Sequence, residues 1–337
     1  MSQLKRIKTL DLSNNRELSD IKILKKFKLL ERLYLSKCKF TNIPKGFSSL
    51  KKLKILHIRN NYYLSDIKGL KKLPNLETLY LDGCNLREIP KKFRSLKSLK
   101  YLNVSSNRGL KGFEGLKNLS QLKEVYIESC NLRKIPNEFK TLKNLTTLNI
   151  SSNPISSYAS LKELIGLEKI TLASSGINKV PEAFSFLKNI KMVLLHDNKN
   201  LSDLSALGGL SKIEYLRLDG CNIKKLPENF NTLINLQQII LQENRGIENL
   251  EILGELTQLS NLNLNNCEIQ SLPNSFINLK SLAFLNLDYN DSLTDITILN
   301  QLKNLTVLYI EDCKEISEKQ IIKLQNTLPS LTVYSDY

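Results

Sequence analysis

The sequence repeats itself about every 23 residues, and this period constrains the fold more than any other feature. In one type of repeat, an apolar-x-apolar phrase is followed three residues later by an asparagine. These asparagines are Asn15, Asn61, Asn107, Asn153, Asn198, Asn244 and Asn290. A second phrase alternates with it and ends at Cys38, Cys84, Cys130, Ser175, Cys221, Cys267 and Cys313. Such a period indicates a solenoid in which each repeat packs against its neighbours. We therefore expect an array of about 14 repeats, in seven alternating pairs, over residues 1–316.

Each apolar-x-apolar phrase alternates inward and outward side chains, as a β-strand does. Strands of one sense at a fixed spacing predict a continuous parallel sheet of about 14 strands. The second phrase continues into turns at Pro44, Pro90, Pro136, Pro181, Pro227 and Pro273. Three residues after these prolines stand Phe47, Phe93, Phe139, Phe184, Phe230 and Phe276. They predict a stacked row of aromatic rings in the layer opposite the sheet.

The residues after the last predicted strand differ from the repeats. Ser317 and Gln320 have the spacing of a capping box at the start of an amphipathic helix. The apolar positions and the end of this helix are predicted at Ile321, Ile322, Leu324, Leu328 and Pro329. We expect residues 317–337 to form a capping helix and a tail. No comparable cap is visible at the N-terminus, so that edge either faces solvent or continues from a longer chain.

The phrases from Leu33 to Cys38 and from Leu79 to Pro90, repeated in register, resemble the leucine-rich-repeat superfamily. Similar phrases occur in plant disease-resistance receptors and in Ras-suppressor-type scaffolds, and bacterial repeat proteins have similar C-terminal endings. The resemblance implies an α/β fold, a right-handed horseshoe-shaped solenoid with its parallel sheet on the concave face. It also implies that the inward Asn or Cys of each repeat hydrogen-bonds neighbouring loop backbone.

The sequence does not contain an evident catalytic or metal-binding arrangement. The six cysteines are spaced by 46, 46, 91, 46 and 46 residues, which is the repeat period. Successive cysteines would lie at least two strands apart, roughly 10 Å, which is too far for disulfides or a metal cage. The two histidines, His57 and His196, fall six repeats apart. We expect no enzyme activity, cofactor, metal or small-molecule substrate.

The formal net charge of +16 is unevenly placed. The outward strand positions sum to −5, so the remainder of the chain carries +21. Lysines dominate the segments that lead into the strands, such as those from Leu24 to Lys28 and from Leu50 to Lys54. Such lysines usually keep a solenoid soluble. The alternative is a weak, salt-sensitive contact with a membrane, whereas nucleic acid is disfavoured because exposed aromatic residues are not interleaved with these lysines.

Charges of alternating sign stand just before successive strands. They are Lys8, Glu31, Lys54, Glu77 and Lys100 in the first half, and Glu168, Lys191 and Glu214 in the second. Neighbouring strands are close enough for such side chains to pair laterally. We expect these pairs to support the register of the sheet.

Outward strand residues that packing does not require point to a binding surface. A first group comprises Tyr34, His57, Tyr80, Tyr101 and Tyr126. A second comprises Met192, Leu194, His196, Tyr215, Arg217 and Ile240. Aromatic, Arg and Met side chains with a polar surround are typical of protein-binding hot spots. The structural alternative for the first group is a strand-stabilising aromatic ladder without a partner.

We therefore expect a non-enzymatic, monomeric scaffold that binds a protein through its concave sheet, the partner presenting basic groups to the C-terminal half. One alternative is the ligand-sensing part of a larger signalling or receptor protein, and another is attachment to nucleic acid or membrane through the basic convex side. The start of the chain does not have the apolar core of a signal peptide, which favours the cytoplasm. A removed leader, or secretion by another route, stays open.

Overall fold

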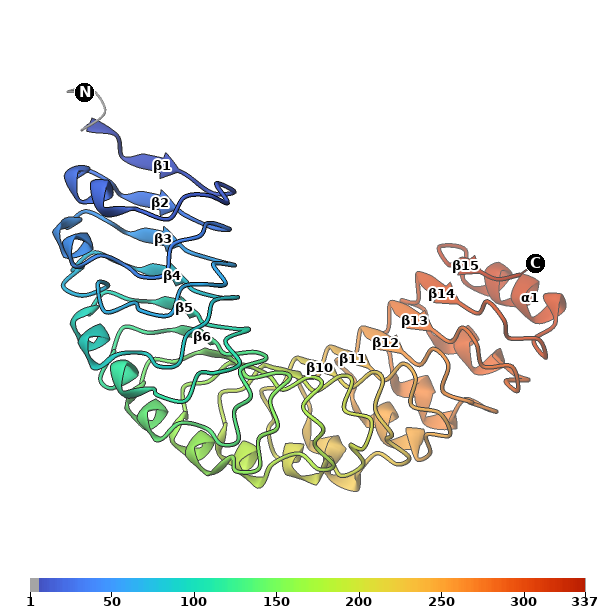
Figure 1. Cartoon of the computed structure of the whole chain (residues 1–337). Helices are drawn as coiled ribbons and strands as arrows, with labels where there is room; N and C mark the ends of the chain where they lie inside the picture. The colour runs from blue at the N-terminus through green and yellow to red at the C-terminus, as the bar shows by residue number, and fades with distance from the viewer. Residues whose placement is uncertain (1–5, 337) are drawn as a thin grey trace. The chain divides into compact units, whose positions relative to one another are not determined.

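The computed structural model describes residues 6–336 and divides into two compact units, Met1–Leu167 (unit 1) and Glu168–Tyr337 (unit 2). Within each unit, Figure 1 shows strands on one side and short turns on the other. Each repeat contributes one strand and one return segment. The repeat solenoid predicted from the sequence is confirmed.

Unit 1 contains a parallel sheet of three-residue strands, each paired with the next along the chain. The strands are β1 (Thr9–Asp11), β2 (Arg32–Tyr34), β3 (Ile55–His57), β4 (Thr78–Tyr80), β5 (Tyr101–Asn103), β6 (Glu124–Tyr126) and β7 (Thr147–Asn149). The strand leucines pair with one another, as Leu10 with Leu33 and Leu33 with Leu56. Their inward side chains therefore form one continuous row of the core.

Unit 2 repeats this arrangement, and each of its strands again pairs in parallel with the next along the chain. Its strands are β8 (Lys169–Thr171), β9 (Met192–Leu194), β10 (Tyr215–Arg217), β11 (Gln238–Ile240), β12 (Asn261–Asn263), β13 (Phe284–Asn286), β14 (Val307–Tyr309) and β15 (Thr332–Tyr334). The α-helix α1 (Glu318–Thr327) lies between β14 and β15 in the chain. Within residues 6–336, no helix has the length and hydrophobicity of a membrane-spanning segment.

Short 3-10 turns form the layer opposite the strands in both units. In unit 1 they are Lys22–Lys26, Lys45–Ser49, Lys91–Ser95, Glu114–Leu116, Asn137–Thr141 and Ala159–Glu163. In unit 2 they are Glu182–Phe186, Ser205–Leu207, Glu228–Thr232, Leu250–Glu255, Asn274–Asn278 and Thr297–Gln301. An extended proline precedes the turn in the second type of repeat, as at Pro44 (φ −61°, ψ 145°). Because proline lacks an N–H, it fits this position without losing a hydrogen bond.

The predicted phenylalanine row is buried, but its rings do not stack on one another. Phe47, Phe93 and Phe139 are fully buried, as are their counterparts in unit 2. The repeats between them place Leu70 and Leu116 at the equivalent position. In the described residues, the ring contact of this layer is between Phe139 and Phe113, edge to face at 6.3 Å. Phenylalanine and leucine therefore alternate along the core.

The C-terminal part departs from the predicted helix and tail, because β15 adds a further strand paired with β14. Helix α1 thus takes the place of a 3-10 turn in a last repeat. The capping box was wrong: Ser317 precedes the helix, but its side chain does not make a capping hydrogen bond. Gln320 instead bonds the preceding repeat, donating to the Thr294 carbonyl. Ile322, predicted as apolar packing, is 50% exposed.

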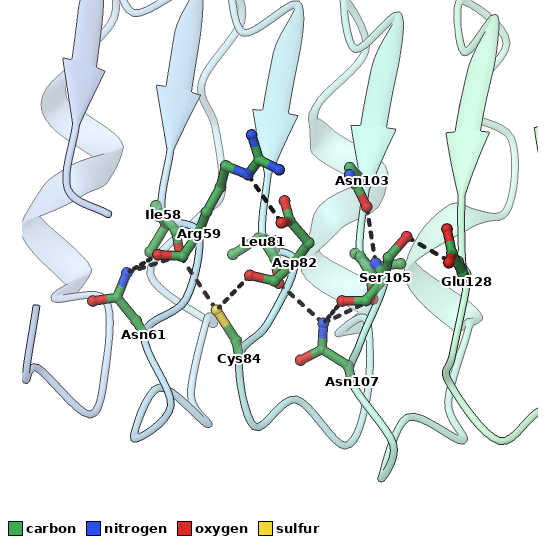
Figure 2. Close-up of polar contacts among 11 residues, drawn as sticks. Ile58, Arg59, Asn61, Leu81, Asp82, Cys84, Asn103, Ser105, Asn107 and Glu128 are labelled. Carbon is green, nitrogen blue, oxygen red and sulfur yellow. Dashed lines mark hydrogen bonds and ion pairs between the residues drawn. The ribbon is translucent and has the colours of Figure 1, made fainter. Parts of the chain in front are cut away.

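Buried asparagines join successive repeats through their backbones. Nδ2 of Asn107 donates to the carbonyls of Leu81 (3.0 Å) and Val104 (2.7 Å). Oδ1 of Asn107 accepts from the N–H of Leu86 at 2.9 Å. One side chain therefore satisfies donors and acceptors of two repeats, and Figure 2 shows its donor side beside Leu81 and Ser105.

The cysteines occupy the same position and make part of this network. All six are free and buried, as predicted. The Cys84 thiol donates to the carbonyl of Ile58 at 3.3 Å, a contact that Figure 2 also shows. The N–H of Cys130 bonds Oδ1 of Asn153 in the next repeat. A thiol is only a weak donor and a weak acceptor. The asparagine side chains therefore make the stronger hydrogen bonds between the two types of repeat, including the bond to the cysteine N–H.

Candidate binding surface on the strands

The outward side chains of the strands in unit 1 bring the first predicted group together. Tyr34, His57 and Tyr80 occupy the third position of consecutive strands and lie in register with one another. Tyr101 and Tyr126 continue the group on β5 and β6. All five side chains are half-buried. We call these five residues the unit 1 patch.

The rings of the unit 1 patch contact each other in one unbroken series. Tyr34 meets His57 edge to face with centroids 4.8 Å apart, and His57 meets Tyr80 at 4.3 Å. Tyr80 and Tyr101 are tilted at 4.7 Å, and Tyr101 and Tyr126 at 5.1 Å. Apart from the closer His57–Tyr80 pair, these separations lie in the favourable range for aromatic pairs, about 4.5–7 Å. The contacts hold the rings in fixed positions on the sheet.

Arg59 lies across the middle of this series. Its guanidinium carbon is 5.3 Å from the Tyr80 ring centroid, and its Nε donates to Oδ2 of Asp82 at 2.9 Å (Figure 2). Asp82 is only 8% exposed, and among the described residues its buried Oδ1 has no hydrogen-bond partner. The Arg59 side chain remains 47% exposed. The arginine is therefore oriented by its neighbours while part of it still faces solvent.

The centre of the unit 1 patch is uncharged at neutral pH. Burial lowers the pKa of His57, and the positive charge of Arg59 lowers it further. Burial raises the pKa of the Tyr126 hydroxyl to about 12, and its hydrogen bond with Glu124 adds to this shift. Burial likewise raises the pKa of Tyr101. The patch thus presents neutral rings and hydroxyl groups beside one oriented cation.

The second predicted group lies on three adjacent strands of unit 2. Met192 pairs with Tyr215, and Arg217 lies between Leu194 and Ile240 in the sheet. Arg217 is held by a bidentate ion pair, with Nε 2.6 Å from Oδ1 and Nη2 3.1 Å from Oδ2 of Asp219. The apolar side chains are half-buried. We call these five residues, with His196, the unit 2 patch.

His196 lies at the edge of the unit 2 patch, after the end of β9. Its Nδ1 is buried and has no hydrogen-bond partner within the described residues. Burial lowers the pKa of His196, and the charge of Arg217 lowers it further. The imidazole is therefore neutral at physiological pH and adds polar surface without charge.

A third aromatic group, on β13 to β15, was not predicted. Tyr309 and Tyr334 stack with centroids 4.4 Å apart and planes 9° from parallel, and Phe284 lies 5.6 Å from Tyr309. Neither of the two groups predicted from the sequence includes Tyr309 or its neighbours. Tyr334 was missed because β15 was not expected. An aromatic residue following Thr332-Val333 was the available signal for a strand.

The predicted lateral charge pairs are present beside the strands except at Glu214, for which the described residues supply no ion-pair partner, and between Lys54 and Glu77. Glu31 lies 3.6 Å from Lys8 and 3.0 Å from Lys54, and Lys100 lies 2.8 Å from Glu77. In unit 2, Lys191 pairs with Glu168 at 3.4 Å. These exposed pairs contribute at most about 1 kcal/mol each. They align the edge of the strands and leave the patches free.

The described residues do not include a cluster of three or more His, Cys, Asp or Glu side chains that could hold a metal ion. His57 is enclosed by the rings of Tyr34 and Tyr80, and not by a hydroxyl or thiol nucleophile. The arrangement is suited to contact by packing and hydrogen bonding, because half-buried rings lie beside an oriented arginine whose side chain is 47% exposed.

Comparison with known proteins supports the repeat architecture. The family profile described as "Leucine-rich repeat region" matches residues 20–172 and 169–334. A leucine-rich-repeat protein of Leptospira interrogans is 28% identical, with a TM-score of 0.85 over 98% of this chain and 84% of that one. The search of curated proteins found no match.

Two further solved structures share the fold at lower identity. An internalin of Listeria monocytogenes is 22% identical, with a TM-score of 0.72 over 100% of this chain and 88% of that one. TLR13, solved in complex with ssRNA13, is 24% identical, with a TM-score of 0.76 over 99% of this chain and 55% of that one.

Proposed function

Since this chain belongs to the leucine-rich-repeat family, we propose that it is a non-enzymatic scaffold that recognises a protein through the outward face of its strands. The unit 1 patch carries this proposal. Its five rings are not needed to fill the core, because the strand leucines behind them are fully buried and form it. An aromatic surface that is fixed before binding loses little conformational entropy when a partner is bound.

The surround of the unit 1 patch favours a protein partner. Tyrosine and arginine are among the residues most enriched at binding hot spots, and both lie here beside buried or half-buried polar groups. Arg59 can donate to a carbonyl or carboxylate of the partner, because its Nε is already held by Asp82. A partner that excludes water from this arginine would strengthen both contacts.

The ring geometry disfavours the alternative of a base-stacking site for nucleic acid. Tyr34, His57 and Tyr80 meet edge to face at 4.8 and 4.3 Å, so each ring covers part of its neighbour. A stacking platform needs exposed ring faces along a basic groove. Here the adjoining arginine is partly neutralised by Asp82, and Glu124 stands beside Tyr126.

Partner capture with matched variants tests the proposal. We would immobilise the chain, expose it to a lysate of the source organism at moderate salt, and compare the wild type with Tyr80→Ala/Tyr101→Ala. The control is Tyr62→Ala/Tyr63→Ala, which removes two tyrosines that are 69% and 60% exposed on a loop after β3. We expect a protein that the wild type and the control retain and the patch variant loses. Equal capture by all three folded proteins would contradict the proposal.

A further inference from the structure

The net excess of positive charge in this chain lies in unit 1. Residues 1–167 contain 34 Lys and Arg against 13 Asp and Glu, a formal charge of +21. Residues 168–337 contain 15 against 20, a formal charge of −5. The net charge of +16 is therefore the difference between a strongly basic unit and a mildly acidic one.

Within unit 1 the excess is concentrated in four segments that run from the turns into β2, β3, β4 and β5. These are residues 22–31, 45–54, 68–77 and 91–100, which we call the lysine face. Together they carry 16 basic and two acidic residues, and 15 of the 16 are lysine. Their lysines are exposed, apart from the half-buried Lys71. Figure 1 shows the return segments of unit 1 stacked beside one another in the same order as the strands.

Hydrogen bonds between consecutive repeats join the four segments into one surface. Oγ of Ser49 donates to the carbonyl of Lys25 at 3.2 Å, which links the first and second segments. Nδ2 of Asn75 donates to the carbonyl of Lys51 at 2.7 Å, which links the second and third. Oγ of Ser98 donates to the carbonyl of Pro74 at 2.5 Å, which links the third and fourth. The charges are thus held side by side at about the strand spacing of 4.8 Å.

The fold itself does not require these lysines. The equivalent segments of unit 2, residues 182–191, 205–214, 228–237 and 251–260, have the same place between turn and strand. They carry three basic and five acidic residues. Each unit is built from the same kind of parallel strands and turns, so a need for folding or solubility does not account for a difference of +14 against −2.

Most of the lysine face is not neutralised by the rest of the chain. Among the described residues, its ion pairs involve Lys22, Lys54, Arg94 and Lys100. Lys45, Lys52, Lys68 and Lys91 are exposed, and within residues 6–336 their side chains have no ion pair or hydrogen bond. Like charges at this density repel each other, and a polyanion relieves that repulsion.

We propose that the lysine face attaches unit 1 to a membrane surface of anionic lipids. Lysine acts as a point charge and does not need the bidentate geometry of arginine, which suits mobile lipid headgroups. Each lysine near an anionic bilayer contributes about a fivefold gain in partitioning. Ile23, 53% exposed beside Lys22, adds an apolar side chain at the edge of this surface.

Nucleic acid is the less favoured polyanion. Phe47 and Phe93 of the lysine face are buried and Phe27 is half-buried, so the four segments do not offer an exposed aromatic side chain on which a base can stack. A short, even row of turns also lacks an element that would enter a groove of a duplex. The surface can therefore contact phosphates without reading bases.

Vesicle co-sedimentation of the full chain tests this proposal. The probes are vesicles of phosphatidylcholine alone and of phosphatidylcholine with about 30% phosphatidylglycerol. One variant replaces Lys45, Lys52, Lys68 and Lys91 with Gln. A matched control replaces Lys199, Lys225, Lys319 and Lys323 of unit 2, which are also exposed, and so lowers the net charge equally. Circular dichroism and thermal unfolding verify that each variant is folded.

We expect the wild type and the unit 2 control to bind the anionic vesicles and not the neutral ones. Salt at about 0.5 M should release both proteins from the vesicles. The lysine-face variant, which lacks four lysines worth about fivefold each, should bind roughly six-hundredfold less at low salt. Failure of the wild type to bind anionic vesicles, or equal loss in both variants, would overturn the proposal.

The same set of proteins separates this proposal from the competing ones. Tighter binding of a labelled single-stranded RNA or duplex DNA than of anionic vesicles at equal salt would overturn the membrane assignment in favour of nucleic acid. Tyr80→Ala/Tyr101→Ala should bind vesicles like the wild type, since the unit 1 patch is not part of the lysine face. Its vesicle binding is thus independent of whether the protein-recognition proposal holds.

Discussion

Nε of Arg59 donates a hydrogen bond of 2.9 Å to Oδ2 of Asp82, a residue that is only 8% exposed. Arg59→Met would leave a buried carboxylate without its cation. We expect the free energy of unfolding to fall by about 1–3 kcal/mol, the usual cost of an unsatisfied buried group. Urea unfolding of the full chain, followed by circular dichroism, measures the change.

The control is the double variant Arg59→Met/Asp82→Asn, in which the buried charge is also removed. It should recover part of the lost stability, because the neutral amide is less costly to bury than an unpaired carboxylate. If the double variant is less stable than Arg59→Met by as much as Asp82→Asn alone costs, the two side chains are not coupled and the interpretation is wrong.

Most of the fold could be predicted from the sequence because each repeat carries its own copy of the strand phrase. The last repeat could not, since Leu331-Thr-Val333 lacks the final Asn or Cys and α1 lengthens the interval before it. Register explains why β15 nevertheless forms: Val333 pairs with Leu308 and takes the place of the strand leucine. The 23-residue period is thus lost in the last repeat, because α1 is longer than the 3-10 turn that it replaces.

The sequence could predict which residues belong to the candidate surface, but not which of their rings contact one another. The alternation of a strand places Tyr34, His57 and Tyr80 outward, and this follows from sequence alone. Ring contacts depend on side-chain rotamers, so the diagonal contacts of Tyr101 with Tyr80 and Tyr126 required the structure. The lysines of the segments that lead into the strands were visible in the sequence, but their concentration in unit 1 was not, because the charges were not compared between the two units.

Asn107 should contribute more to stability than Cys84. Asn107 is fully buried and its side chain serves three carbonyls and one N–H, whereas the Cys84 thiol donates to the Ile58 carbonyl at 3.3 Å and more weakly to the Asp82 carbonyl at 3.9 Å. We expect Asn107→Ala to lower the free energy of unfolding by about 2–4 kcal/mol. For Cys84→Ala we expect a loss of about 1 kcal/mol in addition to the cost of the removed side-chain volume. Chemical denaturation of the two single variants measures both losses of stability. A larger loss for Cys84→Ala would contradict the assignment of the stronger hydrogen bonds to the asparagine.

Tyr101→Ala should weaken binding of the captured partner more than Tyr101→Phe does. The alanine variant removes a ring that contacts both Tyr80 and Tyr126, so we expect a loss of about 2 kcal/mol, or roughly thirtyfold in Kd. The phenylalanine variant keeps those contacts and should lose less than about 1 kcal/mol. Calorimetric titration with the purified partner measures both, and an equal loss would assign the effect to the hydroxyl.

The unit 2 patch is tested separately with Leu194→Asp/Arg217→Glu. This variant places charge on the apolar side of the patch and breaks the bidentate pair with Asp219. If a partner contacts unit 2, its capture should fall by tenfold or more while circular dichroism stays unchanged. Unchanged capture would restrict recognition to unit 1.

The buried thiols should make the protein less stable at alkaline pH. Burial raises the pKa of Cys84 and Cys267 to about 12, and that of Cys130, Cys221 and Cys313 to about 11, from an ordinary value of 9.0. Above pH 9 the unfolded chain loses these protons while the folded chain keeps them. The unfolded state then binds fewer protons, so stability falls as pH rises from about 9 toward 12.

Two measurements check the predicted loss of stability at alkaline pH. The native protein at pH 8 should react slowly with Ellman's reagent, and all six cysteines should react at once in denaturant. A variant with Cys84→Ala and Cys267→Ala should lose less stability than the wild type between pH 8 and pH 10, although it is less stable at pH 8. Rapid modification of the folded wild type would mean that the thiols are not buried, and the alkaline destabilisation would then need another cause.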